Sequence, residues 1–252
     1  MLGLGTSRLE GAYETVKSAL ALGYRHIDTA AMYGNEAEVG RAVRDSGVAR
    51  GEIFVTTKLA NGGHDDVEGE LKASLERLGL DYVDLYLIHW PMPKRVASWK
   101  TLETLVKRGA PIKSIGVSNF TIRHLQELLP QTEIVPAVNQ VEFNPFVYKS
   151  DLLNYNQAKG IQLVAYSPMT RGHKMDNPGL SDIAARCGKT PAQIMLRWSV
   201  QHDVVVIPKA TSAQHQVDNM DIFDWKLSAD DMAKLDRLYD GYRVTEDPEN
   251  YP

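Results

Sequence analysis

The amino-acid sequence predicts an α/β protein, a single-domain (β/α)₈ (TIM) barrel that spans residues 1–252. The first observation is a series of short runs rich in Val, Ile and Leu, as in parallel strands that are covered on both faces. The second is that amphipathic segments with helical periodicity separate these runs. A doubly wound open sheet is the main alternative, but Gly3 and Gly5 lack the third glycine of its phosphate-binding loop.

The expected strands are short and nearly continuous in hydrophobicity, and several of them end at a polar residue. In chain order they are residues 2–6, 25–28, 53–58, 84–89, 113–118, 137–141, 162–166 and 204–208. The residues between them are long enough for a crossover helix in each case, which is the connection that parallel strands require.

The expected helices have apolar residues on one face and recognisable ends. In chain order they are residues 11–22, 36–45, 67–78, 98–107, 122–129, 150–159, 192–202 and 228–238. The third helix repeats apolar groups every three or four residues, at Val67, Leu71, Leu75 and Leu78. Thr190 followed by Pro191 is typical of a helix cap and first turn, and Ser228 begins the last helix in the same way. Strands and helices thus alternate along the chain.

Composition limits the possible function classes. A net charge of −4 and the lack of any block of basic residues argue against nucleic-acid binding. No apolar stretch reaches the roughly 20 residues that span a bilayer, and the start of the chain shows no signal peptide. The single cysteine, Cys187, excludes an intramolecular disulfide and fits a reducing compartment. We expect a soluble, cytoplasmic monomer with no nucleic-acid or membrane partner.

Three neighbouring strands each deliver one ionisable group at their carboxyl end. Asp28 ends the second strand, Lys58 the third and His89 the fourth, and Tyr33 follows the second strand by five residues. Buried strands normally avoid Asp and Lys unless these are paired. Because active sites of such barrels lie at the carboxyl ends of the strands, we expect these side chains to form one polar site.

The chemistry of these four residues suggests a tyrosine whose pKa is adjusted by its neighbours. A Lys58–Asp28 ion pair beside Tyr33 would stabilise the phenolate and lower its pKa from about 10, which makes a general acid. Each residue also has a structural alternative, as an ion pair, a packed tyrosine or a core histidine. A metal site at His26 and Asp28 is a further alternative, but no other ligands follow a shared pattern.

Several motifs, in the same order along the chain, carry a family resemblance. They are residues 23–36 (GYRHIDTAAMYGNE), 57–59 (TKL), 85–91 (LYLIHWP), 115–120 (IGVSNF), 138–142 (VNQVE), 165–168 (AYSP) and 206–209 (VIPK). Over essentially its whole length the sequence resembles the aldo-keto reductase superfamily, most of all its microbial members that reduce small ketones, aldehydes and diketo-sugar acids.

The resemblance implies NAD(P)H-dependent reduction of an aldehyde or ketone to an alcohol, with the cofactor as hydride donor. By this resemblance, Tyr33 is the proton donor and Lys58 lowers its pKa. Asp28 then holds Lys58, and His89 orients the substrate carbonyl. The same fold also includes dinucleotide-binding subunits that sense redox state for a membrane channel, and these are the alternative function.

The coenzyme-binding residues implied by the resemblance follow later strands. Ser118, Asn119 and Gln140 match positions that hydrogen-bond the nicotinamide carboxamide. Tyr166 matches the aromatic residue that stacks on the nicotinamide ring, and Ser167 the hydroxyl that contacts the pyrophosphate.

The segment expected to bind the adenosine phosphate departs from the family pattern. Lys209 and Asn219 are present, and Asp218 replaces a glutamate. Ala210 and His215 stand where the family commonly has a serine and the arginine that clamps the 2′-phosphate. We expect NADP(H) to bind through Lys209 and a hydroxyl of Thr211 or Ser212, with weaker discrimination against NAD(H).

Three further expectations concern the architecture around the site. The chain starts almost at the first strand, without the hairpin with which the family usually begins. The loop at residues 91–97 is short, which suggests a shallow substrate pocket with Trp90 as one wall. Residues 242–252 resemble the family's C-terminal loop over the same mouth.

Overall fold

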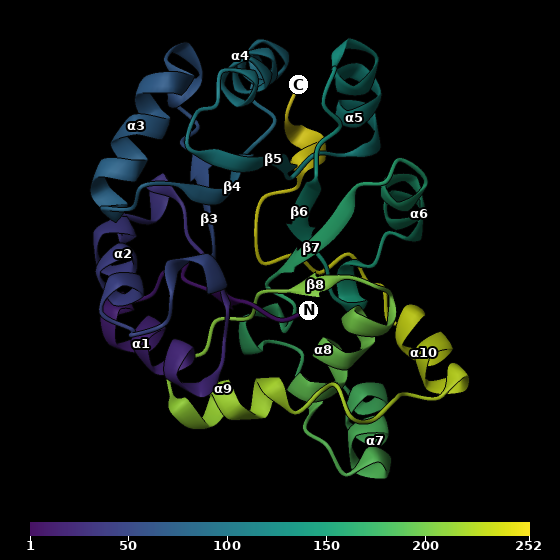
Figure 1. Ribbon diagram of the computed structural model, residues 1–252. Coiled ribbons are helices and arrows are strands. Elements are labelled where there is room, and N and C mark those ends of the chain that lie inside the picture. Colours follow the sequence, from purple (N-terminus) through teal and green to yellow (C-terminus); the bar gives the residue numbers. More distant parts are fainter.

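A computed structural model describes all residues, 1–252. Its eight strands are all parallel and pair in chain order from β1 to β8, and helices surround them (Figure 1). The strands are β1 (Leu4–Gly5), β2 (His26–Asp28), β3 (Phe54–Leu59), β4 (Val83–Ile88), β5 (Ile112–Ser118), β6 (Val138–Glu142), β7 (Gln162–Tyr166) and β8 (Val205–Val206). The predicted (β/α)₈ barrel is confirmed.

Backbone hydrogen bonds between the first and last strands close the barrel. The Gly3 amide donates to the Val206 carbonyl over 2.8 Å, and the Gly5 amide donates to the Pro208 carbonyl over 3.1 Å. Closure leaves no unpaired sheet edge, and it brings the carboxyl ends of all eight strands to one rim.

Ten α-helices cover the strands. They are α1 (Ala12–Leu22), α2 (Glu36–Arg44), α3 (Val67–Leu78), α4 (Arg95–Lys107), α5 (Ile122–Leu128), α6 (Ser150–Ala158), α7 (Pro178–Cys187), α8 (Pro191–Gln201), α9 (Ala213–Met220) and α10 (Ala229–Asp236). The eight predicted helices are present with ends that shift by a few residues, and the Thr190 and Ser228 caps form as expected. None of the helices combines the length and the apolar character needed to cross a membrane.

Two helices, α7 and α9, were missed by the prediction. The buried face of α9 is polar, because Gln216 and Asn219 are its buried residues while Val217 is exposed. The Gln216 side chain bonds to the Thr15 and Ala210 carbonyls and to the Ser18 hydroxyl, which fixes α9 against α1. A helix held by buried hydrogen bonds has no apolar stripe for a periodicity search to detect.

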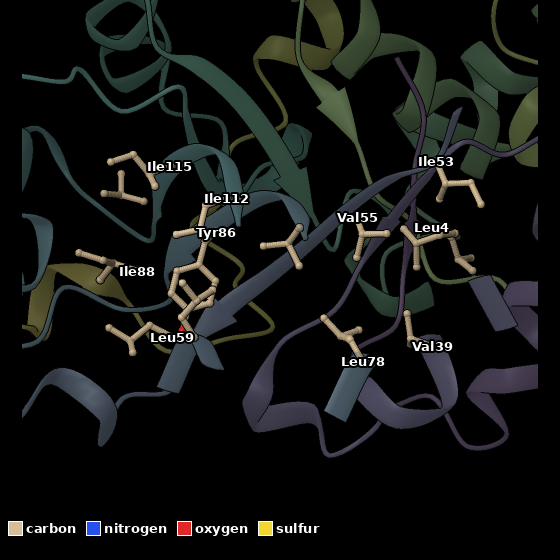
Figure 2. Packing of buried hydrophobic residues seen from close by; sticks show 14 of the residues in the cluster. Leu4, Val39, Ile53, Val55, Leu59, Leu78, Tyr86, Ile88, Ile112 and Ile115 are labelled. Carbon is tan, nitrogen blue, oxygen red and sulfur yellow. The ribbon is translucent and has the colours of Figure 1, made fainter. Parts of the chain in front are cut away.

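The larger hydrophobic core lies between the first five strands and their helices. Figure 2 shows part of it, with Val55, Leu59, Tyr86 and Ile88 of β3 and β4 among the labelled residues. Helices α2 and α3 approach closely at Gly40, where a Cβ atom would lie only 1.7 Å from the Leu78 carbonyl oxygen. This packing holds β2, β3 and β4 in place below the rim that carries the predicted site.

Candidate active site

The four predicted catalytic residues, here called the catalytic group, meet at the rim of the barrel. Asp28 is the last residue of β2, Lys58 lies near the end of β3, and His89 directly follows β4. Tyr33 ends a 3₁₀ turn, Ala31–Tyr33, which brings the chain back over the same rim. Because β2, β3 and β4 are neighbours, one short turn is enough to complete the group.

Lys58 is the centre of the group. Its Nζ donates to Asp28 Oδ1 over 2.5 Å, to the Thr29 carbonyl over 2.8 Å and to the Tyr33 hydroxyl over 3.4 Å. The Lys58 side chain is 0% exposed and that of Asp28 is 2% exposed. The second Asp28 oxygen accepts from Gln140 Nε2 over 2.7 Å. All three ammonium hydrogens and both carboxylate oxygens therefore have partners, which a buried ion pair requires.

The charge states follow from burial and from this pairing. Burial alone would lower the pKa of Lys58, but Asp28 and Tyr33 outweigh it and raise that pKa above its usual value. Burial also raises the pKa of Tyr33, although the Lys58 ammonium acts to lower it. The expected net lowering of the Tyr33 pKa is therefore wrong, because burial outweighs the Lys58 cation. At neutral pH the phenol carries its proton beside a fixed cation.

His89 lies against Tyr33 as a neutral group. The two rings meet edge to face with centroids 5.6 Å apart. Burial, aided by the Lys58 charge, lowers the pKa of His89 to about 3. Its Nδ1 is buried and has no hydrogen-bond partner. An unprotonated imidazole next to the phenol can hydrogen-bond a substrate oxygen without adding a second positive charge.

The residues expected at the nicotinamide continue the rim without a break. Ser118 ends β5 and donates to the Gln140 carbonyl in β6, while Asn119 Nδ2 donates to the His89 carbonyl over 2.9 Å. The Tyr166 hydroxyl at the end of β7 donates to Asn119 Oδ1 over 2.7 Å. Together with the Gln140–Asp28 bond, these contacts join the expected coenzyme residues to the catalytic group.

The start of the next loop is in an uncommon backbone conformation. Ser167 has a φ of 46° and is only partly buried. A non-glycine residue in the left-handed region is uncommon and occurs at ligand-binding loops. Its hydroxyl therefore lies on a fixed turn directly after Tyr166.

The C-terminal tail, residues 242–252, lies beside the same mouth (Figure 1). Tyr251 stacks on Trp90 with ring centroids 4.9 Å apart and an interplanar angle of 27°. Arg123 Nη2 donates to the Tyr251 carbonyl over 2.6 Å, and His124 Nε2 lies 3.0 Å from the Pro252 carbonyl. Sequence reasoning missed Tyr251 and Arg123, because a lone tail aromatic and an exposed helix arginine carry no local signal.

A cavity of about 430 Å³ lies beneath this tail. Asn119 and Glu142 line it, together with residues of α5, α6 and the tail. Asp28, Tyr33, Lys58 and His89 do not line it. The cavity therefore adjoins the four predicted catalytic residues through Asn119 and is separate from them.

The residues expected at the adenosine phosphate form a second region, which extends from just before α9 to Asp218 and Asn219 in its last turn. Lys209 and Thr211 are exposed, and Lys209 Nζ donates to the Arg8 carbonyl over 3.3 Å. Asp218 accepts from Gln214 over 2.8 Å. The buried Asn219 Nδ2 has no partner in the structure.

The N-terminus of α9, the exposed Lys209 ammonium and the unpartnered Asn219 amide suit a phosphorylated nucleotide. Ser212 caps α9 by accepting from the His215 amide over 3.2 Å, and His215 itself is exposed. The residues present at this edge therefore fit the adenosine end of the expected coenzyme.

The barrel and its polar rim define an enzyme of the (β/α)₈ class, and comparison with known proteins identifies the family. The Aldo/keto reductase family model matches residues 1–176 and 173–240. The glyoxal reductase of Bacillus subtilis is 48% identical over 98% of this chain and 91% of its own length. The chain belongs to the aldo-keto reductase family and is an oxidoreductase that reduces carbonyl groups.

Solved structures agree with this assignment. The aldo-keto reductase MGS-M4 from a deep-sea metagenome superposes with a TM-score of 0.94 and 42% identity, over 100% of this chain and 95% of that one. A silkworm (Bombyx mori) aldo-keto reductase complexed with NADPH gives a TM-score of 0.92 at 36% identity, over 97% of this chain and 86% of that one.

Proposed function

We propose that this chain reduces small aldehydes or ketones, that NADPH is its preferred coenzyme, and that Tyr33 is the general acid. One observation carries the proposal: the protonated Tyr33 hydroxyl lies 3.4 Å from the buried ammonium of Lys58 and beside the neutral ring of His89. The coenzyme, when bound, supplies the hydride. The chain's own residues supply the proton and hold the carbonyl.

Each member of the group has a distinct task. Tyr33 gives its proton to the carbonyl oxygen as negative charge develops there, and water later restores the phenol. Lys58 stabilises the phenolate that this transfer leaves, and Asp28 keeps Lys58 charged and fixed. His89 donates a hydrogen bond to the same oxygen and so orients the substrate.

We assign the coenzyme's nicotinamide carboxamide to the rim formed by Ser118, Asn119 and Gln140. The partly exposed ring of Tyr166 would stack on the nicotinamide, and Ser167 on its left-handed turn would bond the pyrophosphate. These positions adjoin the catalytic group through Asn119 and Gln140.

The adenosine end would lie along α9, from the residues before its start to its last turn. Lys209 and Thr211 would bind the 2′-phosphate, and Asp218 and Asn219 the adenine. Because exposed His215 replaces a guanidinium, we propose that NADPH is favoured over NADH only modestly.

The substrates we propose are small molecules. The B. subtilis relative is named for glyoxal, and the short loop after β4 leaves Trp90, stacked on Tyr251, as the main aromatic wall. We propose aldehydes and dicarbonyls of a few carbon atoms as the first substrates to test.

The test is Tyr33→Phe, assayed by oxidation of NADPH with a panel of small carbonyls. We expect a loss of kcat of roughly 10²–10⁴-fold, which is the usual contribution of a general acid, with unchanged coenzyme affinity by fluorescence titration. Tyr13→Phe is the matched control. Because Tyr13 bonds Asp45 on the surface, this variant should retain full activity. Full turnover by Tyr33→Phe would refute the assigned acid. Coenzyme binding by the wild type without turnover of any carbonyl would favour a redox-sensing role.

A further inference from the structure

Glu142, the last residue of β6, is a buried carboxylate without a task in the proposed reaction. It is 5% exposed. Its Oε1 accepts from the Val244 amide over 2.9 Å, and its Oε2 accepts from the Thr245 hydroxyl over 2.7 Å and from the Thr245 amide over 3.3 Å. The three donors belong to the beginning of the tail. Glu142 therefore fastens the tail to the rim of the barrel.

Thr245 extends this contact to the residues expected at the nicotinamide. Its Oγ1 lies 3.0 Å from the Tyr166 hydroxyl, which in turn lies 2.7 Å from Asn119 Oδ1. Glu142, Thr245, Tyr166 and Asn119 thus form a continuous series of side chains, here called the tail network. Asn119 also donates to the His89 carbonyl, so the network reaches the catalytic group.

A count of hydrogens indicates that the network is incomplete. Three oxygen pairs are in contact, but only the Tyr166 and Thr245 hydroxyls supply hydrogens, because an ionised carboxylate and an amide oxygen only accept. With Tyr166 donating to Asn119 and Thr245 donating to Glu142, the Tyr166–Thr245 contact has no hydrogen. The Tyr166 hydrogen can therefore go to Asn119 or to Thr245 but not to both. A donor from elsewhere on Asn119 Oδ1 would replace Tyr166 there and leave the Tyr166 hydrogen for Thr245, which strengthens the contact with the tail.

We propose that Glu142 and Thr245 are positioning residues that couple the C-terminal tail to coenzyme binding through Tyr166 and Asn119. This inference rests on the proposed function, in which Asn119 binds the nicotinamide carboxamide, a group that carries N–H donors. Docking of the tail then strengthens coenzyme binding, and by linkage the coenzyme strengthens docking of the tail by the same factor.

The first experiment is Thr245→Val, which removes the hydroxyl and nearly preserves shape. We expect the NADPH Kd, from fluorescence titration, to rise about tenfold, the effect of one buried hydrogen bond, with little change in kcat at saturating coenzyme. Thr245→Ser keeps the hydroxyl and should restore the wild-type Kd. Thr101→Val is the matched control, because the Thr101 hydroxyl only bonds a carbonyl within α4.

A double-mutant cycle separates the network from a general structural effect. Tyr166→Phe removes only the hydroxyl that faces Thr245. If the two act together, Thr245→Val should add almost nothing to the Kd of Tyr166→Phe. If the two substitutions raised the NADPH Kd of the double variant by the product of their separate factors, the proposal would be overturned.

Hydrogen exchange measures how firmly the tail is held, first without and then with NADPH. In Glu142→Gln the Val244 and Thr245 amides should exchange faster than in the wild type, and NADPH should protect them less. Glu249→Gln is the matched tail control, since the exposed Glu249 contacts Lys149 and not the network. Unchanged Kd and unchanged tail exchange in Thr245→Val and Glu142→Gln would refute the coupling alone. A wild type that binds no NADPH would instead refute the proposed function.

Discussion

The catalytic group and the edge at α9 differ in how their charges are satisfied. At the catalytic group, Lys58 and Asp28 are buried, and Thr29, Tyr33 and Gln140 complete their hydrogen bonds. At the α9 edge, the Lys209 ammonium is exposed and contacts only a carbonyl of Arg8.

In the proposed function, this difference separates the proton transfer from the selection of the coenzyme. A proton donor works only when its hydrogen and the neighbouring charge are held in place before the substrate arrives, and burial makes that charge effective. A phosphate site needs only cations and open N–H groups that the ligand itself will satisfy. The first region should therefore be sensitive to any single change, and the second should tolerate exchange of its residues.

Removal of the Asp28 charge should have the largest effect. Asp28→Asn leaves the Lys58 ammonium buried without its counter-ion, which typically costs about 3–5 kcal/mol of unfolding free energy, and it should also reduce kcat by at least roughly 10²-fold. Urea unfolding and the NADPH assay measure the two effects. Asp230→Asn, at an exposed pair with Lys234, should leave the urea midpoint unchanged. If the two substitutions behaved alike, the buried pair would not be the rigid centre of the site.

A second prediction concerns acid stability of the barrel interior below the catalytic group. Burial lowers the pKa of His26 to about 4, so the unfolded chain, with a histidine pKa near ~6.5, binds the proton more readily. Stability is therefore lost as pH falls from about 6.5 to about 4, by up to roughly 3 kcal/mol from this residue. His26→Gln should flatten the dependence of unfolding free energy on pH in that window. His215→Gln, at the exposed edge, is the matched control. An equal effect of the two substitutions would contradict the difference between the buried interior and the exposed edge.

The smallest predicted effect lies at the α9 edge. His215→Arg adds a guanidinium that can bind the 2′-phosphate through two parallel hydrogen bonds, so the preference for NADPH over NADH should rise about tenfold. The ratio of the two coenzyme Kd values measures it, and kcat with NADPH should stay the same. An unchanged ratio would mean that the 2′-phosphate does not reach residue 215.

Much of the fold was predictable because burial on both faces leaves a strong pattern in a strand. The runs that end at Asp28, Lys58 and His89 could be aligned along one rim before any coordinates, since parallel strands share their direction. The helix α9 could not be found in this way, because Gln216 and Asn219 form its buried face. Its place depends on hydrogen bonds to residues far away in the sequence, such as Thr15.

The sequence by itself determined the barrel, the order of its strands and the four residues at one end of it. These properties follow from local patterns of hydrophobicity and from one ionisable group per strand. Only the tertiary structure decided the charge state of Tyr33, since burial and the Lys58 cation oppose each other and their balance depends on packing. It also brought Glu142 to Thr245, a pair 103 residues apart, and such a contact exists only once the barrel has closed and the tail has returned to its rim.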